Sequence, residues 1–286
     1  NAAFVSHGDM DRIKRFFRKE LPERDYQLLK RLSSRFSFIP QLIGADLKEE
    51  NVVIVQELIN GSPPSIGEIN SSIELFADIF RRVHKDRYIV SFLRSNGAIL
   101  NFQEHIDHEL RVVNKIISKE FFNFFRYELK VDLGEISDTL NNYRPESYSE
   151  DLVLTHEDPN INNFLLDTKG DLYLIDWDNA QLGDPLRDIG IFLWRYVEED
   201  KWDSFMKYAG IEFNSRKNIK DLSWWVIRCC VEIIHWFYER GLIDEAMEYS
   251  MYLKTAIRKG GFNEVSIWDE LYKKPYNNVT EIFHLT

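Results

Sequence analysis

Four polar side chains between residues 156 and 176 have the types and the spacing needed for metal-assisted phosphoryl transfer. They are His156, Asp158, Asn163 and Asp176, in the segment LVLTHEDPNINNFLLDTKGDLYLIDW, residues 152–177. A loop carboxylate such as Asp158 can accept the proton of a substrate hydroxyl, and an amide and a second carboxylate can hold the Mg²⁺ that bridges nucleotide phosphates. Mg²⁺ prefers oxygen ligands of this kind. The pattern therefore predicts a catalytic base at Asp158 and metal ligands at Asn163 and Asp176.

Three short apolar runs surround these residues and predict the strands that position them. Residues 152–154 lead into the loop, and residues 164–166 and 172–175 are separated by the turn sequence DTKGD, which contains a glycine for a positive φ. A hairpin of this length brings Asn163 and Asp176 to the same end of neighbouring strands, where both can reach one ion. Each short motif is weak alone, but their order along the chain argues against ordinary loop residues.

The sequences HEDPNINN and LYLIDWDNAQLGDPLRDIG resemble the aminoglycoside phosphotransferase and choline kinase superfamily. The resemblance implies an α+β, bilobal protein-kinase-like fold with a small β-rich N-terminal lobe and a large helical C-terminal lobe. It implies that Asp158 is the catalytic base and that Asn163 and Asp176 are metal ligands. It also implies structural support from His156 and from Asp188, which would brace the catalytic loop. The cofactors implied are Mg²⁺ and a phosphate donor, either ATP or GTP.

We expect two lobes, divided near residue 60. Residues 1–60 would form the nucleotide-binding lobe and hinge, and residues 61–286 the C-terminal lobe, with the catalytic loop and metal hairpin at 150–190 and a helical acceptor-binding region at 191–286. Between residues 66 and 148 the apolar residues mostly have helical spacing, most clearly at 72–84.

The nucleotide-binding residues are predicted in the first lobe. The apolar run 52–59 before a Gly-Ser-Pro-Pro breaker is typical of a strand that ends in a loop. By resemblance, the backbone of Glu57 and Ile59 would hydrogen-bond the purine ring there. Lys14, in the stretch RIKRFF, would contact the phosphates, although a solvated basic strand edge is the alternative. On the helical stretch that follows, Asp25 lies where the family has a Glu that pairs with this Lys, and Asp is one methylene shorter.

The start of the chain departs from the family pattern. Only thirteen residues precede Lys14, whereas the family normally has two strands and a nucleotide-covering loop there. The N-terminal lobe is therefore expected to be truncated at its start. Either the first strand and loop lie before Asn1 or this protein lacks them, and the sequence leaves both alternatives open.

Composition limits the classes of partner and compartment. The chain has 286 residues and a net charge of −11, with 47 acidic and 36 basic residues, which disfavours a nucleic-acid partner. No apolar run reaches eighteen residues, so no transmembrane helix is expected. The two cysteines, Cys229 and Cys230, are adjacent and cannot form an ordinary disulfide. We expect a cytoplasmic protein.

The aromatic, helical region after Asp188 is where the family builds its acceptor site. Dense apolar stripes are first of all core packing. However, the ring of Trp236 and the carboxylates of Glu232 and Glu239 could bind a protonated amine, and the ring contact would be worth roughly 0.5–2 kcal/mol. The excess of acidic over basic residues suits a cationic acceptor, but it equally suits a solvated surface.

The function expected from these features is small-molecule phosphorylation. The chain would transfer the nucleotide γ-phosphate to a hydroxyl of a small polar or cationic acceptor, as aminoglycoside phosphotransferases do. The alternatives are a choline, ethanolamine or homoserine kinase, and a pseudokinase that binds nucleotide without turnover.

Overall fold

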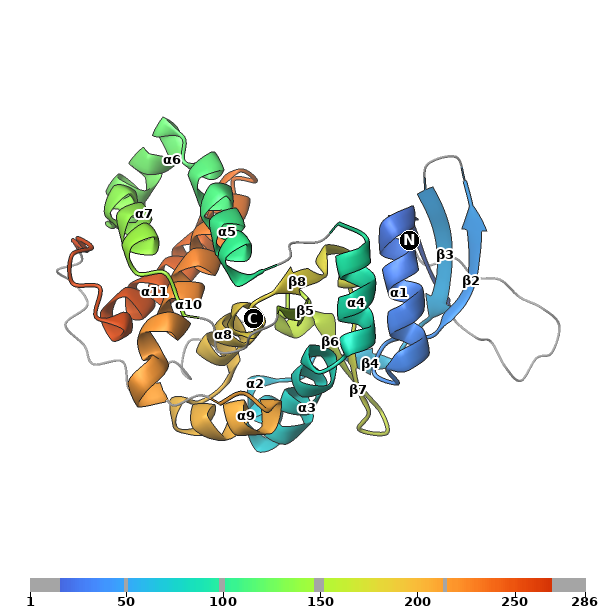
Figure 1. Ribbon diagram of the computed structural model, residues 1–286. Helices are drawn as coiled ribbons and strands as arrows, with labels where there is room; N and C mark the ends of the chain where they lie inside the picture. The colour runs from blue at the N-terminus through green and yellow to red at the C-terminus, as the bar shows by residue number, and fades with distance from the viewer. Residues whose placement is uncertain (1–15, 49–50, 98–100, 147–151, 213–214, 269–286) are drawn as a thin grey trace.

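The computed structural model describes residues 16–48, 51–97, 101–146, 152–212 and 215–268. Figure 1 shows a small sheet with one helix at one end of the molecule and a group of helices at the other. Short strands and the helix at residues 185–196 lie between these two parts. The arrangement confirms the expected α+β fold with a small sheet-containing N-terminal part and a helical C-terminal part.

The N-terminal part is an antiparallel sheet with a helix on it. Its strands are β1 (Phe16–Pro22), β3 (Asn51–Glu57) and β2 (Leu42–Leu47), in that order across the sheet. Pro22 ends β1, because its ring cannot donate to a strand ladder, and α1 (Glu23–Arg35) follows at once. Buried leucines on one face of α1 pack towards the sheet. The strand predicted after residue 51 and the helix predicted after Pro22 are both confirmed.

The helices of the C-terminal part begin mostly at polar capping residues. Ser65, Asp86, Asn101, Ser118, Asp132 and Asp184 each accept a backbone hydrogen bond with their side chain at a helix start, which satisfies donors that the helix leaves free. The helices are α2 (Ile66–Ser71), α3 (Ile73–His84), α4 (Arg87–Ser95), α5 (Phe102–Ile116), α6 (Lys119–Phe124), α7 (Leu133–Asn142), α8 (Pro185–Tyr196), α9 (Trp202–Ala209), α10 (Ser215–Tyr238) and α11 (Ile243–Gly260). A π-helical turn, Phe125–Leu129, continues α6.

Short strands surround the predicted catalytic residues. They are β4 (Gly61–Ser62), β5 (Val153–Thr155), β6 (Phe164–Asp167), β7 (Leu172–Leu174) and β8 (Gln181–Gly183). The order β4-β6-β7 makes one sheet, and β5 pairs with β8. The predicted hairpin is β6–β7, and the glycine of its turn has φ 87°. Because β4 pairs with β6, the chain joins the C-terminal part soon after β3. The division into two lobes near residue 60 stays a prediction.

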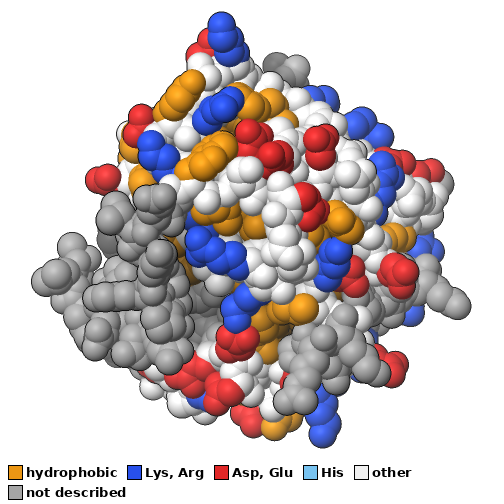
Figure 2. Space-filling model, turned by 90° about the vertical axis from the view of Figure 1, so that its left-hand side faces the viewer, with side chains coloured by type: hydrophobic (Ala, Val, Ile, Leu, Met, Phe, Trp, Pro, Cys, Tyr) orange, Lys and Arg blue, Asp and Glu red, His pale blue; other side chains and the backbone are white. Residues whose placement is uncertain are grey.

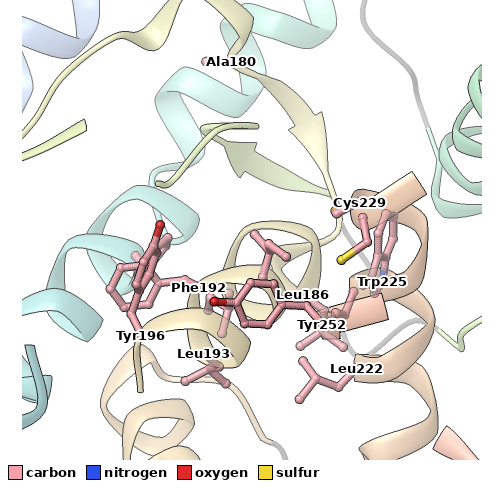
Figure 3. Packing of buried hydrophobic residues seen from close by; sticks show 14 of the residues in the cluster. Ala180, Leu186, Phe192, Leu193, Tyr196, Leu222, Trp225, Cys229 and Tyr252 are labelled. Carbon is pink, nitrogen blue, oxygen red and sulfur yellow. The ribbon is translucent and has the colours of Figure 1, made fainter. Parts of the chain in front are cut away.

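The core of the C-terminal part is built around α8. Figure 3 shows Phe192 and Leu186 of α8 among Trp225 of α10 and Tyr252 of α11. The aromatic stripes after residue 188 are thus largely core, with the rings of Trp224 and Trp225 fully buried. None of the described helices is long and apolar enough to cross a membrane.

Candidate active site

A cavity of about 240 Å³ lies where the N-terminal sheet meets the hairpin β6–β7. Its walls are largely apolar, and both predicted hinge residues, Glu57 and Ile59, line it. Charged and polar side chains also line it, from Lys19 on β1 and from Asn163, Asp176 and Asp178 around the hairpin. An apolar slot with a few polar groups is the usual form of a small-ligand site, and this one suits a flat base with a charged tail.

Asp158 is oriented by two asparagine side chains. The Nδ2 amide of Asn160 donates to both carboxylate oxygens of Asp158, each at 2.9 Å. The Nδ2 amide of Asn163 donates to the Asp158 backbone oxygen at 2.8 Å and to its Oδ2 at 3.1 Å. The carboxylate is therefore held as an acceptor, which is the state that a general base requires. The nitrogen of the Asn163 amide faces Asp158, and the predicted role of its amide oxygen as a metal ligand stays a prediction.

Asp188 and His156 tie the loop of Asp158 to its surroundings. Asp188, buried in the first turn of α8, accepts hydrogen bonds from the backbone nitrogens of His156, at 2.6 Å, and Glu157, at 2.9 Å. The His156 Nε2 lies 2.8 Å from the backbone oxygen of Ile175, and its ring packs on Trp177. These contacts join the loop to α8 on one side and to the end of β7 on the other. They suit the supporting roles predicted for both residues.

Asp176 follows β7 in a left-handed conformation, with φ 64°. The Ile175 backbone nitrogen donates to the Asn163 backbone oxygen at 2.9 Å, so the hairpin brings Asn163 next to Asp176, as its length predicted. The Nζ of Lys19 lies 2.6 Å from Asp176 Oδ1 and also contacts Asp178 Oδ2. Although burial lowers the pKa of Lys19, its hydrogen bonds to the two carboxylates raise it overall. A cationic group therefore already lies between the two acids.

These groups fit a Mg²⁺ ion. Proteins usually hold Mg²⁺ through one or two carboxylates together with substrate phosphates, and Asp176, Asp178 and the Asn163 amide oxygen, which line the cavity, could supply ligands of that kind. Within the described part of the chain, no cluster of three or more His, Cys, Asp or Glu side chains could hold a metal by itself. The nucleotide phosphates would have to complete this site.

Residues 12–214 match the family model described as "Phosphotransferase enzyme family". The chain belongs to this family. The structure resembles the choline kinase from Streptococcus pneumoniae, which is 14% identical with a TM-score of 0.59 over 87% of this chain and 86% of that one. It also resembles a spectinomycin phosphotransferase in complex with ADP and spectinomycin, which is 18% identical with a TM-score of 0.60 over 92% of each chain. The ethanolamine kinase from Plasmodium vivax is 14% identical, with a TM-score of 0.59 over 90% of this chain and 81% of that one.

Lys19 also lines the cavity, although it was not among the site residues predicted from the sequence. Lys14, the predicted phosphate-binding residue, lies outside the described residues, so its role stays a prediction. β1 continues to Pro22, and Phe17 and Lys19, two residues apart on the strand, both line the cavity. The alternation within FFRKELP was the available signal, because side chains two apart on a strand share a face. In a phosphotransferase, an ammonium in this position is suited to nucleotide phosphates.

Asp25 lies on α1 near this lysine. Burial raises the pKa of the Asp25 carboxyl, Arg24 and Lys19 lower it, and Asp178 raises it. The charges of Lys19 and Asp178, which both line the cavity, thus act on the pKa of Asp25. Its predicted pairing with the phosphate-binding lysine stays a prediction, because Lys14 lies outside the described residues.

The exchange of Lys19 for Met should weaken nucleotide binding about 10- to 100-fold. The lost contact is a hydrogen bond between charged groups, worth about 1.5–3 kcal/mol, and each 1.4 kcal/mol corresponds to a factor of ten. Calorimetric titration with Mg-ATP measures the change. Arg18→Met is the matched control, because Arg18 is exposed on the same strand. If Lys14→Met weakens binding and Lys19→Met does not, the phosphate contact belongs to Lys14.

The three predicted acceptor-binding residues already have partners within the chain. The Glu232 carboxylate pairs with Arg228 and lies 3.5 Å from Arg187 Nη2. The guanidinium of Arg240 lies 3.8 Å from the centre of the Trp236 ring, and Glu239 lies 3.7 Å from His235 Nε2. Of the three, Glu232 is the one that contacts the catalytic loop region, through Arg187, which donates to the Glu157 backbone oxygen.

The helical end of the molecule has no single sign of charge. Figure 2 shows hydrophobic, basic and acidic side chains interleaved over this face, part of which is covered by grey atoms. The net charge of −11 is therefore not concentrated in the visible surface near α5 to α7, α10 and α11. The acceptor-binding roles of Glu232, Glu239 and Trp236 stay predictions.

Proposed function

We propose that this chain is a Mg²⁺-dependent kinase that transfers the γ-phosphate of ATP or GTP to a hydroxyl of a small acceptor, with chemistry like that of aminoglycoside phosphotransferases. The observation that carries the proposal is the position of Asp158. Asn160 and Asn163 hold its carboxylate as an acceptor, and the same Asn163 lines the cavity with Lys19 and Asp176. Asn163 thus links the proposed base, Asp158, to the charged end of the cavity, where the nucleotide phosphates would bind.

Each residue has a role that follows from its contacts. Asp176 and the amide oxygen of Asn163 would hold Mg²⁺, which when bound neutralises charge on the phosphates. Lys19 would exchange its carboxylate partners for phosphate oxygens. Asp158 would take the proton of the acceptor hydroxyl, and the backbone of Glu57 and Ile59 would hydrogen-bond the purine. Transfer of this kind depends mainly on positioning and electrostatics.

The donor to test first is ATP. The choline kinase relative was crystallised in complex with AMP, and the spectinomycin phosphotransferase with ADP. Both are adenine nucleotides, which supports an adenine nucleotide as donor for this chain, with GTP as the alternative. Two buried free thiols, Cys229 and Cys230, are compatible with a reducing compartment, and we propose a cytoplasmic location.

The acceptor is the open part of the proposal. Relatives of the same fold are described as acting on choline and ethanolamine or as binding spectinomycin and hygromycin B. Nucleotide consumption with Mg²⁺ should be measured against a panel of aminoglycosides, choline, ethanolamine, homoserine and sugars. An acceptor that raises consumption above the acceptor-free rate, with a phosphorylated product found by mass spectrometry, identifies the substrate class.

A cationic acceptor held by carboxylates should bind more weakly as salt increases. Screening shortens the range of surface charge interactions from about 30 Å at 0.01 M to about 3 Å at 1 M ionic strength, so the KM for the acceptor should rise across this range. Steady-state kinetics with the best acceptor of the panel tests this. A KM that does not change with ionic strength would rule out a cationic acceptor held by carboxylates. The proposal that the chain is a kinase would not be affected.

A pseudokinase that binds nucleotide without turnover is the second candidate. The residue that favours it is Asp25, which is one methylene shorter than the Glu that the family has at this position. Nucleotide consumption distinguishes the two candidates. A pseudokinase would bind nucleotide, but no acceptor would raise nucleotide consumption above the acceptor-free rate, and Asp158→Asn would not change that rate.

A further inference from the structure

Glu157, between His156 and Asp158, has a backbone conformation that favours glycine. Its φ is 77°, in the left-handed region, where a side chain costs free energy that glycine avoids. The side chain is nevertheless a carboxylate, and it is 5% exposed. Burial of a charge is unfavourable unless partners compensate. The charged, buried side chain of Glu157 therefore indicates that its contacts stabilise the conformation of the loop.

The contacts of Glu157 hold both its side chain and its backbone. Its Oε1 accepts a hydrogen bond from the Thr155 hydroxyl, and its Oε2 accepts one from Gln181 Nε2 at 2.9 Å. The Nη1 of Arg187 lies 2.7 Å from Oε2 and also donates to the Glu157 backbone oxygen at 3.0 Å. One guanidinium thus clamps the side chain and the carbonyl of the residue that immediately precedes Asp158.

Arg187 is itself fixed by helices on the other side. It lies in the first turn of α8, and its Nε is 3.5 Å from Glu109 Oε2 of α5. Arg228 of α10 pairs with the same Glu109 oxygen at 2.6 Å and with Glu232. We call Glu109, Glu157, Arg187, Arg228 and Glu232 the loop-anchoring cluster. It connects the catalytic loop to α5, α8 and α10 through charges that are mostly buried.

We infer that Glu157 is a positioning residue, whose charged carboxylate, clamped by Arg187, holds the left-handed turn that presents Asp158 to the acceptor hydroxyl. The inference rests on the proposed kinase function. Asp158 follows the clamped carbonyl directly, so a change in the turn moves its carboxylate. A displacement of about 1 Å in a reacting group can lower a rate about 100-fold.

The charge of this carboxylate changes near neutral pH. Burial raises the pKa of Glu157 to about 7, against the opposing effect of Arg187. Asp188 of α8 and Glu109 of α5 raise it further, and the Thr155 hydrogen bond lowers it. Below about pH 7 the protonated carboxyl no longer offers Arg187 a negative charge, so the clamp weakens as the pH falls.

Other charged or titratable groups surround the loop-anchoring cluster. Arg228 and Glu232 of α10 lie behind Arg187 and pair with each other. On α5, burial lowers the pKa of His105 to about 4, so this imidazole is neutral over the range in which Glu157 titrates. Along the loop, His156 and Asp158 are the flanking groups.

The test compares the wild type with Glu157→Gln, which keeps the size and removes the charge. With a pKa of about 7, Glu157 is about one-tenth ionised at pH 6 and almost fully ionised at pH 8.5, so the wild-type kcat should rise by up to about tenfold over this range. The Glu157→Gln kcat should not change with pH in this range and should lie about 100-fold below the wild-type value at pH 8.5, while the nucleotide KM changes little. Glu212→Gln, which removes an exposed carboxylate, is the control and should follow the wild type.

A second measurement does not depend on turnover. Hydrogen exchange of a peptide that contains residues 155–160 should be about tenfold faster in Glu157→Gln at pH 8, because the Asp188 hydrogen bonds of the loop open more often. Equal exchange, or a Glu157→Gln enzyme with the wild-type kcat and pH profile, overturns the inference. If the wild type transfers no phosphate at all, the proposed function fails, and the exchange data still decide whether Glu157 anchors the loop.

Discussion

Asp158→Asn is expected to lower kcat about 10²- to 10⁴-fold, the usual contribution of a positioned general base. The amide of Asn cannot take up the proton of the acceptor hydroxyl. The change in shape is small, and Asn163 can still donate to the backbone oxygen of residue 158, as it does at 2.8 Å in the wild type. Folding and nucleotide binding should therefore stay close to those of the wild type. Steady-state kinetics with the acceptor found by the panel measures the effect.

The control for this substitution is Asp171→Asn, which makes the same chemical change in the exposed turn between β6 and β7. It should leave kcat unchanged. A wild-type rate in Asp158→Asn would remove Asp158 from the mechanism. Loss of the cooperative thermal transition in Asp158→Asn, but not in the control, would assign the residue a structural role.

Asp176→Ala is expected to abolish the Mg²⁺-dependent part of nucleotide binding, and Asn163→Ala to weaken it less. Asp176 brings a full negative charge to the ion, whereas Asn163 brings the dipole of an amide carbonyl. A loss of about 100-fold or more corresponds to about 2.8 kcal/mol. Calorimetric titration of nucleotide, with Mg²⁺ and then with a chelator, separates the metal-dependent affinity from the rest.

Asp171→Ala, in the exposed turn, is the control and should bind Mg-nucleotide as the wild type does. Metal-free nucleotide binding should persist in Asp176→Ala, because Lys19 remains and loses one of its two carboxylate partners. If Asp176→Ala and Asn163→Ala both retain the wild-type response to Mg²⁺, the two residues do not share an ion, and the role of the hairpin as a metal site is wrong.

Local patterns were enough to predict the parts of the site that depend on short-range geometry. The runs around residue 156, the turn at residues 167–171 and the run before Asp176 define β5, β6 and β7, and they place Asn163 beside Asp176. Strand alternation and turn chemistry act over only a few residues, so one sequence displays them directly. The helix at 73–84 was predictable for the same reason.

The position of Lys19 depended on packing between distant segments. Lys19 and Asp176 are 157 residues apart, and the strand pairing places Lys19 opposite Ile54. A basic stretch offers several lysines and arginines, and the register of β1 against β3 decides which of them faces the cavity. The register results from the packing of whole strands against each other and against α1. The short segment RIKRFF carries no information about these contacts.

The sequence by itself determined the reaction type that the motifs suit, the family, and the order of loop, hairpin and helices. The tertiary structure decided how the charges pair. Glu232 looked like an exposed ligand for an amine, but in the fold it pairs with Arg228 and lies near Arg187. Glu157 was not among the residues predicted from the sequence, but in the fold its side chain is buried against Arg187. Motifs arise from contacts between near neighbours in the chain, whereas the partner of a buried charge comes from whichever helix packs against it, and that is settled only when the whole core forms.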